Sequence, residues 1–334
     1  MNLTIWTGGV AKSVAASDGD TVLEAALAAG VRFPFGCQSG ECGVCKCELV
    51  EGVDFDLRSH TPTALSERER ARGKILACCA VIKGSITVRL AHQDVVDQHV
   101  LPCRVTAVEQ VTGDVAVFKL LPEYGRSLSF KAGQFVQLRL PNGAERAYSM
   151  ANRPDETLLE FHVRRWAGGA ASEYIHRTLA VGDSVQVKGP KGDAWYRDEH
   201  PGPILAIAGG TGIAPITSIV RTAVARDPRR PIHLYFGVRR PEDFYGVEVF
   251  EAMAGRHPNV RFVPVAEFAA GGRYRKGLVT DAVAEDFGGF ESGRIYMAGP
   301  PAMIAAGRDL AARFGVDDHY CHADSFVNTS GMAA

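Results

Sequence analysis

Three cysteines in one glycine-rich stretch constrain this chain more than any other feature. In FGCQSGECGVCKC, residues 35–47, Cys37, Cys42 and Cys45 follow the spacing C-x4-C-x2-C, and Cys78 lies further along in ILACC. This spacing is typical of plant-type [2Fe–2S] centres, whose irons are bound by thiolates. The glycines between the cysteines let a tight loop adopt strained dihedrals and bring N–H groups close to the sulfurs. The stretch therefore predicts an iron–sulfur cluster.

A zinc knuckle and buried structural thiols are the alternative interpretations of these cysteines. Zinc sites commonly use two C-x2-C pairs or mixtures of Cys and His, whereas this loop contains a single such pair. The pattern therefore favours a cluster over zinc. Either of the adjacent Cys78 and Cys79 can supply the fourth ligand, and Cys47 fits a buried small apolar residue.

Length and composition predict several domains and no disulfide framework. The 334 residues, 46% hydrophobic and 22% charged, are enough for two or three domains with cores of their own. The net charge of −1 implies no broad attraction to nucleic acid or to a membrane surface. The N-terminal MNLTIWTGG lacks a basic region followed by an apolar core, and no apolar run approaches the length of a membrane span. We therefore expect a cytoplasmic protein.

Changes in the hydrophobic pattern divide the chain into three units. Residues 1–92 combine short strands with the amphipathic helix TVLEAALAAG, which ends at Gly30, and predict a small, mostly β unit. A polar linker, 93–101, follows. Residues 102–200 alternate apolar and polar positions between Gly and Pro turns, which predicts an antiparallel barrel. In residues 201–334 apolar strands alternate with helical stretches, which predicts a βαβ series with a parallel sheet.

Two further motifs lie in the second and third units. RAYSMAN, residues 146–152, ends a predicted barrel strand. AGGTGIAP, residues 208–215, follows an apolar strand and opens a helix. Gly210 and Gly212 would let a dinucleotide pyrophosphate approach the backbone, and the helix N-terminus would favour its charge. Pro215 stands where G-x-G-x-x-G has its third glycine, and no Gly-Lys-Ser/Thr of a P-loop follows.

With the cysteine loop, RAYSMAN and GGTGIAP in this order, the chain resembles the ferredoxin–NAD(P)H reductase family over essentially its whole length. More narrowly, it resembles the reductase components of bacterial ring-hydroxylating oxygenases, such as the naphthalene and terephthalate dioxygenase reductases. The resemblance implies a multidomain α+β fold. Its parts would be a β-grasp-like [2Fe–2S] ferredoxin domain, an antiparallel β-barrel domain for FAD and an α/β parallel-sheet domain for NAD(P)H.

The resemblance also implies a flavin site. Arg146 would pair with a flavin phosphate through its planar guanidinium. Tyr148 would lie against the isoalloxazine ring and Ser149 would hydrogen-bond near its reactive nitrogen, which makes these two the candidate catalytic residues. Further residues that would line FAD, or hold its pyrophosphate at a helix N-terminus, are Val163, Arg164, Gly169, Ala170, Ala171 and Ser172. Phe326 would approach the flavin, with core packing as its alternative role. FAD is expected over FMN by analogy with relatives that carry an N-terminal ferredoxin.

A second strand-end loop, YMAGPPAM, completes the implied dinucleotide site. Its Gly299, Pro300 and Met303 would lie beside the nicotinamide, and the first loop would contribute Gly210, Thr211 and Gly212. Relatives usually carry Cys before this Gly-Pro, where this chain has Ala298. We expect this difference to alter the rate or the nicotinamide orientation while the reaction is retained.

Coenzyme choice is expected in FGVRRPEDFY, after the next strand. Arg239 and Arg240 could receive a 2′-phosphate, whereas Glu242 or Asp243 could accept a hydrogen bond from a free ribose hydroxyl. These residues are therefore compatible with NADPH and with NADH. The resemblance favours NADH, with NADPH as the alternative.

The cofactors together predict an electron relay. A nicotinamide gives up two electrons as hydride, metal centres accept them singly, and a flavin can do both, so the expected order is NADH, FAD, [2Fe–2S] and an external acceptor. The resemblance implies a Rieske-type ferredoxin or the terminal oxygenase of an aromatic ring-hydroxylating system as acceptor. A soluble diiron monooxygenase, a deoxysugar pathway and, more distantly, a redox sensor are the alternatives. The ten histidines form no Rieske pattern, so no site for oxygen activation is evident.

Overall fold

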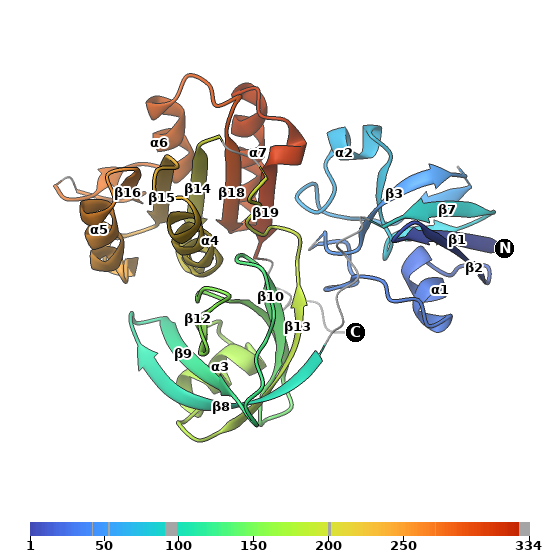
Figure 1. The fold of residues 1–334 in the computed structure, drawn as a ribbon, viewed down its shortest axis with the longest axis horizontal. Coiled ribbons are helices and arrows are strands. Elements are labelled where there is room, and N and C mark those ends of the chain that lie inside the picture. Colours follow the sequence, from blue (N-terminus) through green and yellow to red (C-terminus); the bar gives the residue numbers. More distant parts are fainter. Residues whose placement is uncertain (42, 53, 91–98, 200–201, 271, 327–334) are drawn as a thin grey trace. The chain divides into compact units, whose positions relative to one another are not determined.

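The computed structural model describes residues 1–334 apart from 42, 53, 91–98, 200–201, 271 and 327–334. The chain consists of two compact units, Met1–Asp97 and Gln98–Ala334 (Figure 1). Most of the expected linker lies outside the described residues. Strand β8 begins at His99, within the stretch expected to be linker.

The first unit is built on a mixed sheet with the strand order β2-β1-β7-β3-β5. Strand β1 is parallel to β7 and antiparallel to β2, and β3 runs antiparallel to both of its neighbours. The pair β4–β6 forms a small separate sheet. The bounds are β1 Asn2–Thr7, β2 Val10–Ala15, α1 Val22–Ala28, β3 Lys46–Glu51, β4 Phe55–Leu57, α2 Glu67–Ala71, β5 Lys74–Leu76, β6 Ala80–Ile82 and β7 Ile86–Arg89.

Helix α1 shows why the predicted helix forms where it does. The Thr21 hydroxyl accepts from the Glu24 N–H at 3.2 Å, and the Glu24 carboxylate accepts from the Thr21 N–H at 2.8 Å, a reciprocal capping box. Val22 and Leu23 are buried in the core of the unit. Gly30, with φ +67°, follows the helix in the left-handed conformation that commonly ends helices. The predicted helix end at this glycine is confirmed.

The first half of the second unit is an antiparallel sheet of order β11-β10-β13-β8-β9-β12. Its two outermost strands are joined by the bridge between Met150 and Phe161, which confirms the predicted barrel-like architecture. Alternate residues of β12 are buried, and Phe161 stacks on Phe118 with ring centres 5.3 Å apart. The bounds are β8 His99–Gln110, β9 Val115–Pro122, β10 Phe135–Arg139, β11 Glu145–Ser149, β12 Leu159–Arg164, α3 Ala170–Arg177 and β13 Ser184–Lys191.

The second half is a parallel sheet of order β17-β16-β15-β14-β18-β19, as the βαβ pattern predicts. Apolar residues of α4 and α5 belong to one core cluster, and those of α6 and α7 belong to another. Helices therefore cover both faces (Figure 1). The bounds are β14 Ile204–Gly209, η1 Gly210–Gly212, α4 Ile213–Arg226, β15 Ile232–Val238, η2 Pro241–Asp243, α5 Val247–Arg256, β16 Val260–Ala266, β17 Arg275–Lys276, α6 Val279–Asp286, β18 Arg294–Gly299, α7 Pro301–Arg313, η3 Asp318–Tyr320 and β19 Cys321–Ser325.

The strand order reverses at β14, and this reversal places the two predicted loops together. From β14 the chain proceeds through β15 and β16 on one side, and it returns to pair β18 with the other side of β14. Open α/β sheets bind ligands at such a switch point, beyond the carboxyl ends of the strands. The glycine-rich turn after β14 and the Gly-Pro loop after β18 both lie there.

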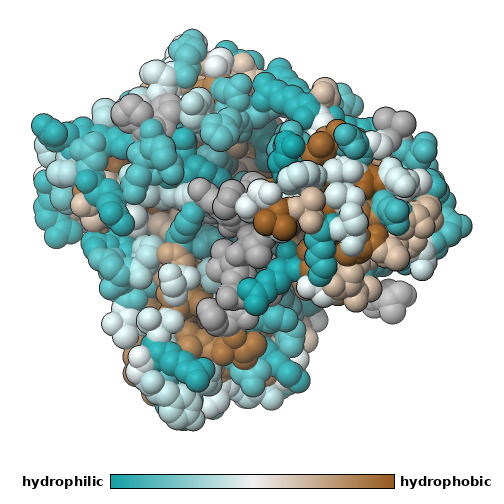
Figure 2. Space-filling model, turned by 45° about the vertical axis from the view of Figure 1, so that its right-hand side comes forward, coloured by the Kyte–Doolittle hydropathy of each residue, from teal (hydrophilic) through white to brown (hydrophobic). Residues whose placement is uncertain are grey.

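On the face drawn in Figure 2, hydrophilic residues cover much of the surface and the apolar areas are small and separate. Among the described residues, no helix combines the length and the apolar character that a membrane crossing requires.

Candidate functional site

The cysteine loop lies between α1 and β3, and the sheet brings its end to the fourth thiol. Cys45 directly precedes β3, which pairs with β5, and Cys78 follows β5. The Sγ atoms of Cys45 and Cys78 are 3.2 Å apart, and the Cys78 N–H donates to the Cys45 sulfur at 3.5 Å. Cys42 lies outside the described residues. The described thiols thus have the chemistry that iron requires.

Backbone amides surround the first cysteine of the loop. The N–H groups of Ser39 and Glu41 donate to the Sγ of Cys37 at 3.4 and 3.3 Å. Such hydrogen bonds stabilise a thiolate and tune the reduction potential of a cluster that the thiolate binds. Gly40 and Gly43 have φ values of +76° and +71°, a conformation that other residues rarely adopt. The backbone conformation therefore favours glycine at these two positions, as predicted.

The adjacent thiols Cys78 and Cys79 differ in their surroundings. Cys79 Sγ lies 3.7 Å from Cys78 Sγ and donates to the Ser59 carbonyl at 3.7 Å. A Cβ atom at Gly40 would lie 2.7 Å from the Cys79 sulfur, so Cys79 packs under the loop. The hydrogen bond with Cys45 lowers the pKa of Cys78 to about 7, and burial raises the pKa of Cys79 to about 12. Both geometry and charge favour Cys78 as a ligand.

Strand β11 carries the three residues expected at the flavin. Arg146 is exposed, and Tyr148, two residues later, is partly buried against the barrel core. Burial raises the pKa of Tyr148 above its usual range, so its hydroxyl stays protonated. Ser149 is buried, and its hydroxyl donates to the Asp324 carboxylate at 3.0 Å. Burial raises the pKa of Asp324 to about 6.

Val163 and Arg164, the two residues expected to line the flavin, are adjacent on strand β12, so their side chains lie on opposite faces of the sheet. The Val163 side chain is in the barrel core, and its carbonyl accepts from a ring nitrogen of His176 at 2.9 Å. Arg164 forms an ion pair with Asp114 at 2.9 Å. A Cβ atom at Gly210 would lie 3.5 Å from Nη1 of Arg164, so this guanidinium reaches the glycine-rich turn. Arg164 is thus shared by the barrel and the parallel sheet.

Helix α3 begins at the expected pyrophosphate position. Gly169 is its N-cap, and no side chain caps this end. Ala170 and Ala171 form the first turn, where N–H groups lack partners within the helix. Ser172 is buried, and its hydroxyl accepts from the Trp166 N–H at 3.0 Å, which closes the preceding loop.

An open cavity of about 480 Å³ borders this helix end. Residues that line the cavity include Asn142, Gly168, Ala170, Tyr174 and Arg177. Asn142 donates from Nδ2 to the Ala170 carbonyl at 3.2 Å, which fixes the neighbouring hairpin to the helix. Glu173 also lines the cavity and pairs with Arg177 at 2.7 Å, so the feature suited to an anionic phosphate group is the uncapped helix N-terminus.

The glycine-rich turn is packed against β18 by one glycine and open at another. Gly210 has φ +56°, and the nearest atom to a Cβ there would be the Arg164 guanidinium at 3.5 Å. Gly212 has ordinary helical dihedrals, but its Cβ would lie 2.0 Å from the Ala298 carbonyl oxygen. Thr211, between them, is partly exposed. Gly212 is therefore required by packing within the protein, and Gly210 and Thr211 form the accessible part of the turn.

The Gly-Pro loop after β18 contacts the end of β14 directly. A Cβ at Gly299, whose φ is +149°, would lie 3.0 Å from the Gly209 Cα. A Cβ at Gly209 would lie 2.7 Å from the Met303 sulfur and 2.8 Å from Pro300. Met303 thus covers the contact between the two strand ends. Ala298, 1% exposed, is enclosed in the sheet.

The C-terminal strand β19 connects the expected flavin strand to the expected nicotinamide loop. Asp324 binds the Ser149 hydroxyl, and two residues later the Phe326 N–H donates to the Gly299 carbonyl at 2.9 Å. Ser149 and Gly299, which are far apart in the chain, therefore both bind to the tripeptide 324–326. Asp324 was missed by sequence reasoning, although a carboxylate at the end of an apolar strand is a signal that could have found it.

The structure leaves the arginines expected at the coenzyme ribose at the surface. Arg239 is exposed, its Nε lies 4.0 Å from the Glu267 carboxylate, and its guanidinium lies 5.8 Å from the Phe268 ring centre. The Arg240 N–H donates to Asp243 at 2.9 Å, which starts the short η2 turn. At this strand end a carboxylate thus lies near the Arg239 guanidinium, whereas Asp243 binds the backbone of Arg240.

These sites define a class of protein, an iron–sulfur flavoprotein reductase. The sequence matches the 2Fe-2S iron-sulfur cluster binding domain over residues 7–83, the oxidoreductase FAD-binding domain over 102–196 and the oxidoreductase NAD-binding domain over 206–309. These matches establish the three cofactor domains. The N-terminal match lies within the first compact unit, and the other two lie within the second.

Whole-chain relatives narrow the class. The chain is 36% identical to the ferredoxin–NAD(P)+ reductase component of naphthalene 1,2-dioxygenase/salicylate 5-hydroxylase systems of Ralstonia sp., covering 93% of this chain and 94% of that protein. It is 38% identical to an aromatic O-demethylase reductase subunit of Amycolatopsis sp., covering 99% and 100%. A solved Amycolatopsis reductase, 37% identical, superposes with a TM-score of 0.76 over 98% of this chain and 99% of that one. The chain belongs to the family of NAD(P)H-dependent [2Fe–2S] flavoprotein reductases that serve as components of oxygenase systems.

Proposed function

We propose that this chain takes hydride from NADH and delivers electrons singly to a Rieske-type ferredoxin or to the terminal oxygenase of an aromatic ring-hydroxylating system. The observation that carries the proposal is the tripeptide 324–326 at the end of β19, which binds Ser149 on one side and Gly299 on the other, at 3.0 and 2.9 Å. This contact holds a flavin-type strand beside a nicotinamide-type loop. Hydride transfer requires such proximity.

The residues of the chain would hold the cofactors as follows. Cys37, Cys42, Cys45 and Cys78 would bind the iron–sulfur cluster, with the amides of the loop directed at the first sulfur. Arg146 and the uncapped end of α3 would bind the phosphates of FAD. When bound, FAD accepts an electron pair as hydride and releases electrons one at a time, and the cluster carries one electron.

Ser149 and Asp324 would control the proton at the reacting edge of the flavin. The Ser149 hydroxyl donates to Asp324, so its own lone pairs face away from that carboxylate. Burial raises the pKa of Asp324 to about 6. The pair can therefore hold or release one proton near neutral pH. Tyr148, whose hydroxyl stays protonated, would supply a flat apolar surface to the ring.

The first experiment is an anaerobic titration of the as-isolated protein with NADH, followed by absorbance and low-temperature EPR. Bleaching of the flavin band together with a [2Fe–2S]¹⁺ signal is the expected result. A flavin that is reduced while the cluster stays oxidised would contradict the relay and would favour a redox sensor. Comparison of NADH with NADPH in the same assay tests the coenzyme preference.

An aromatic O-demethylase is a second candidate acceptor, because the reductase subunit of one is 38% identical over 99% of this chain and 100% of that protein. A soluble diiron monooxygenase and a deoxysugar pathway would draw on the same relay. Reconstitution of the reduced protein with each class of acceptor separates these functions. The expected result is rapid reoxidation by a Rieske-type ferredoxin or oxygenase and slow reoxidation by the others.

A further inference from the structure

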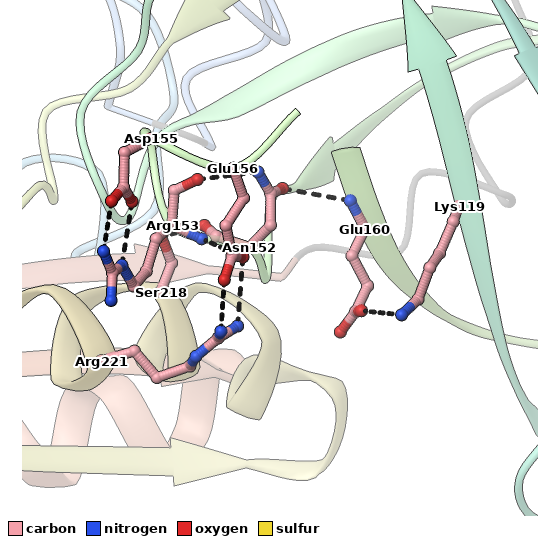
Figure 3. Close-up of polar contacts among 8 residues, drawn as sticks. All are labelled: Lys119, Asn152, Arg153, Asp155, Glu156, Glu160, Ser218 and Arg221. Carbon is pink, nitrogen blue, oxygen red and sulfur yellow. Dashed lines mark hydrogen bonds and ion pairs between the residues drawn. The ribbon is translucent and has the colours of Figure 1, made fainter. Parts of the chain in front are cut away.

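The segment between β11 and β12 contacts the helix that follows the glycine-rich turn. Both strands carry expected flavin residues, and α4 begins directly after Gly212. The segment 150–158 therefore belongs to the expected flavin side, and α4 belongs to the expected dinucleotide side. Figure 3 shows residues of this segment beside Ser218 and Arg221 of α4. A contact between them connects the two halves of the proposed hydride-transfer site.

A buried hydrogen bond makes the first part of this contact. The Ser218 hydroxyl, completely buried on α4, donates to the Asn152 carbonyl at 2.6 Å. Asn152 is also buried, and its side-chain oxygen accepts from the Glu160 N–H of β12 at 3.0 Å. Figure 3 shows Asn152 between these two partners. One residue thus links the end of β11, the start of β12 and α4.

A bidentate ion pair makes the second part, one helical turn further along α4. Both terminal nitrogens of Arg221 bind the Glu156 carboxylate, one at 3.3 Å and the other closer (Figure 3). The same carboxylate accepts from the Arg153 N–H at 3.0 Å, which fixes its orientation. The Arg153 guanidinium is occupied by Asp155. Glu156 is therefore available to Arg221.

A third contact shows that α4 rests on the barrel at more than one place. A Cβ at Gly133 would lie 2.8 Å from Cδ1 of Ile219, so this loop glycine lies in close contact with the helix side chain.

The ion pair between Arg221 and Glu156 is partly exposed, with side-chain exposures of 33% for Arg221 and 36% for Glu156. Exposed pairs of this kind contribute little to stability. The geometry of the fork, by contrast, specifies direction as well as distance.

We infer that Arg221, through its bidentate contact with Glu156, is a positioning residue that holds α4 and its glycine-rich turn in register with the flavin strand and so sets how the nicotinamide meets the flavin. This inference rests on the proposed function. The adenine end of the dinucleotide would bind the parallel sheet alone. The nicotinamide end would depend on the register, because a misplacement of about 1 Å at a reacting pair can lower a rate about 100-fold.

The test measures flavin reduction by stopped-flow absorbance in the holoprotein and uses Arg221→Gln and Glu156→Gln. We expect each to slow reduction at saturating NADH about tenfold, as a partial misplacement would. The double variant should be no slower than either single variant, because each substitution removes the same interaction between Arg221 and Glu156. Arg221→Lys should restore the rate only in part, since it keeps the charge and lacks the fork.

Binding of ADP-ribose, measured by calorimetry, separates positioning from a general structural role. This probe lacks the nicotinamide, so its affinity should stay within about twofold of wild type, a difference of about 0.4 kcal/mol. Arg226→Gln is the matched control, because Arg226 is exposed at the end of the same helix and makes no ion pair with any described residue. It should leave both measurements unchanged.

The outcomes distinguish this inference from the proposed function. Wild-type protein that NADH does not reduce would refute both. Wild-type reduction together with an unchanged rate in Arg221→Gln would refute the positioning role alone. Equal losses of ADP-ribose affinity and of reduction rate would also refute it, because the residue would then support the fold of the dinucleotide site in general.

Discussion

Two glycines in one turn are expected to be destabilised by alanine to different degrees, because packing requires the first, Gly212, and backbone conformation requires the second, Gly210. Gly212 has φ −58° and ψ −15°, which alanine adopts without strain, but its Cβ would lie 2.0 Å from the Ala298 oxygen and 2.8 Å from the Gly299 nitrogen. Gly210 has φ +56°, which alanine disfavours, but no atom within 3.4 Å would obstruct its Cβ. Gly212→Ala tests sterics alone and Gly210→Ala tests conformation alone.

The magnitudes follow from these distances. Real Cβ atoms essentially never approach within 3.0 Å of such neighbours, so Gly212→Ala must move the turn and β18 apart by about 1 Å. Overpacking of this kind costs about 3 kcal/mol when both sides are backbone. For Gly210→Ala the left-handed conformation costs about 1–2 kcal/mol. A gain of about 0.5 kcal/mol from the stiffer unfolded chain offsets part of it, which leaves about 1 kcal/mol.

The assay is urea unfolding followed by tryptophan fluorescence and circular dichroism, with the flavin reduction rate as a second readout. We expect Gly212→Ala to lower the transition midpoint about three times as much as Gly210→Ala. Gly212→Ala should also weaken NADH binding, because the separation opens the switch point of the sheet. A Gly210→Ala variant that is less stable than Gly212→Ala would refute the reasoning, since conformational strain would then outweigh the steric contact.

Three shorter predictions concern single side chains. Cys78→Ser should lose most of the iron and the [2Fe–2S] absorbance while Cys79→Ser keeps both, and the reverse result would identify Cys79 as the ligand. Burial raises the pKa of Asp324 from 3.8 in the unfolded chain to about 6. The folded state therefore binds the extra proton, and wild type should lose up to about 3 kcal/mol relative to Asp324→Asn as the pH rises from 4 to 6. A difference that grows toward acid pH in urea unfolding would contradict this sign. Ala298→Cys should change the rate of flavin reduction while the reaction is retained, and a wild type without reductase activity would contradict the expectation that alanine suffices at this position.

Local sequence patterns were enough for the parts of this protein whose chemistry is local. The cysteine spacing needs one short loop, and the positive φ values of Gly40 and Gly43 confirm the conformational role given to its glycines. The alternation of buried residues in β12 of the barrel and the complete burial of the apolar strand β14 in the parallel sheet likewise follow from the hydrophobic pattern. In each case the residues that specify the local structure lie within a few positions of it in the sequence.

Other features were open until distant segments were brought together. Cys78 and Cys79 are equivalent in sequence, and only the pairing of β3 with β5 places one of them 3.2 Å from Cys45. The glycine-rich turn predicts dinucleotide approach, but the Ala298 oxygen at 2.0 Å from a Cβ at Gly212 assigns that glycine to packing. Both outcomes depend on strand register, which no local pattern specifies.

The sequence by itself determined the class of each module, because cluster, flavin and dinucleotide sites each need particular residue types at short spacings. The tertiary structure decided how the modules of the second unit work together. Ser149 and Asp324 are 175 positions apart and 3.0 Å apart in space, and Arg221 meets Glu156 across 65 positions. A carboxylate or an arginine has no local signature of its partner. Packing of whole sheets selects the contact, because many pairings are chemically possible and the fold permits few.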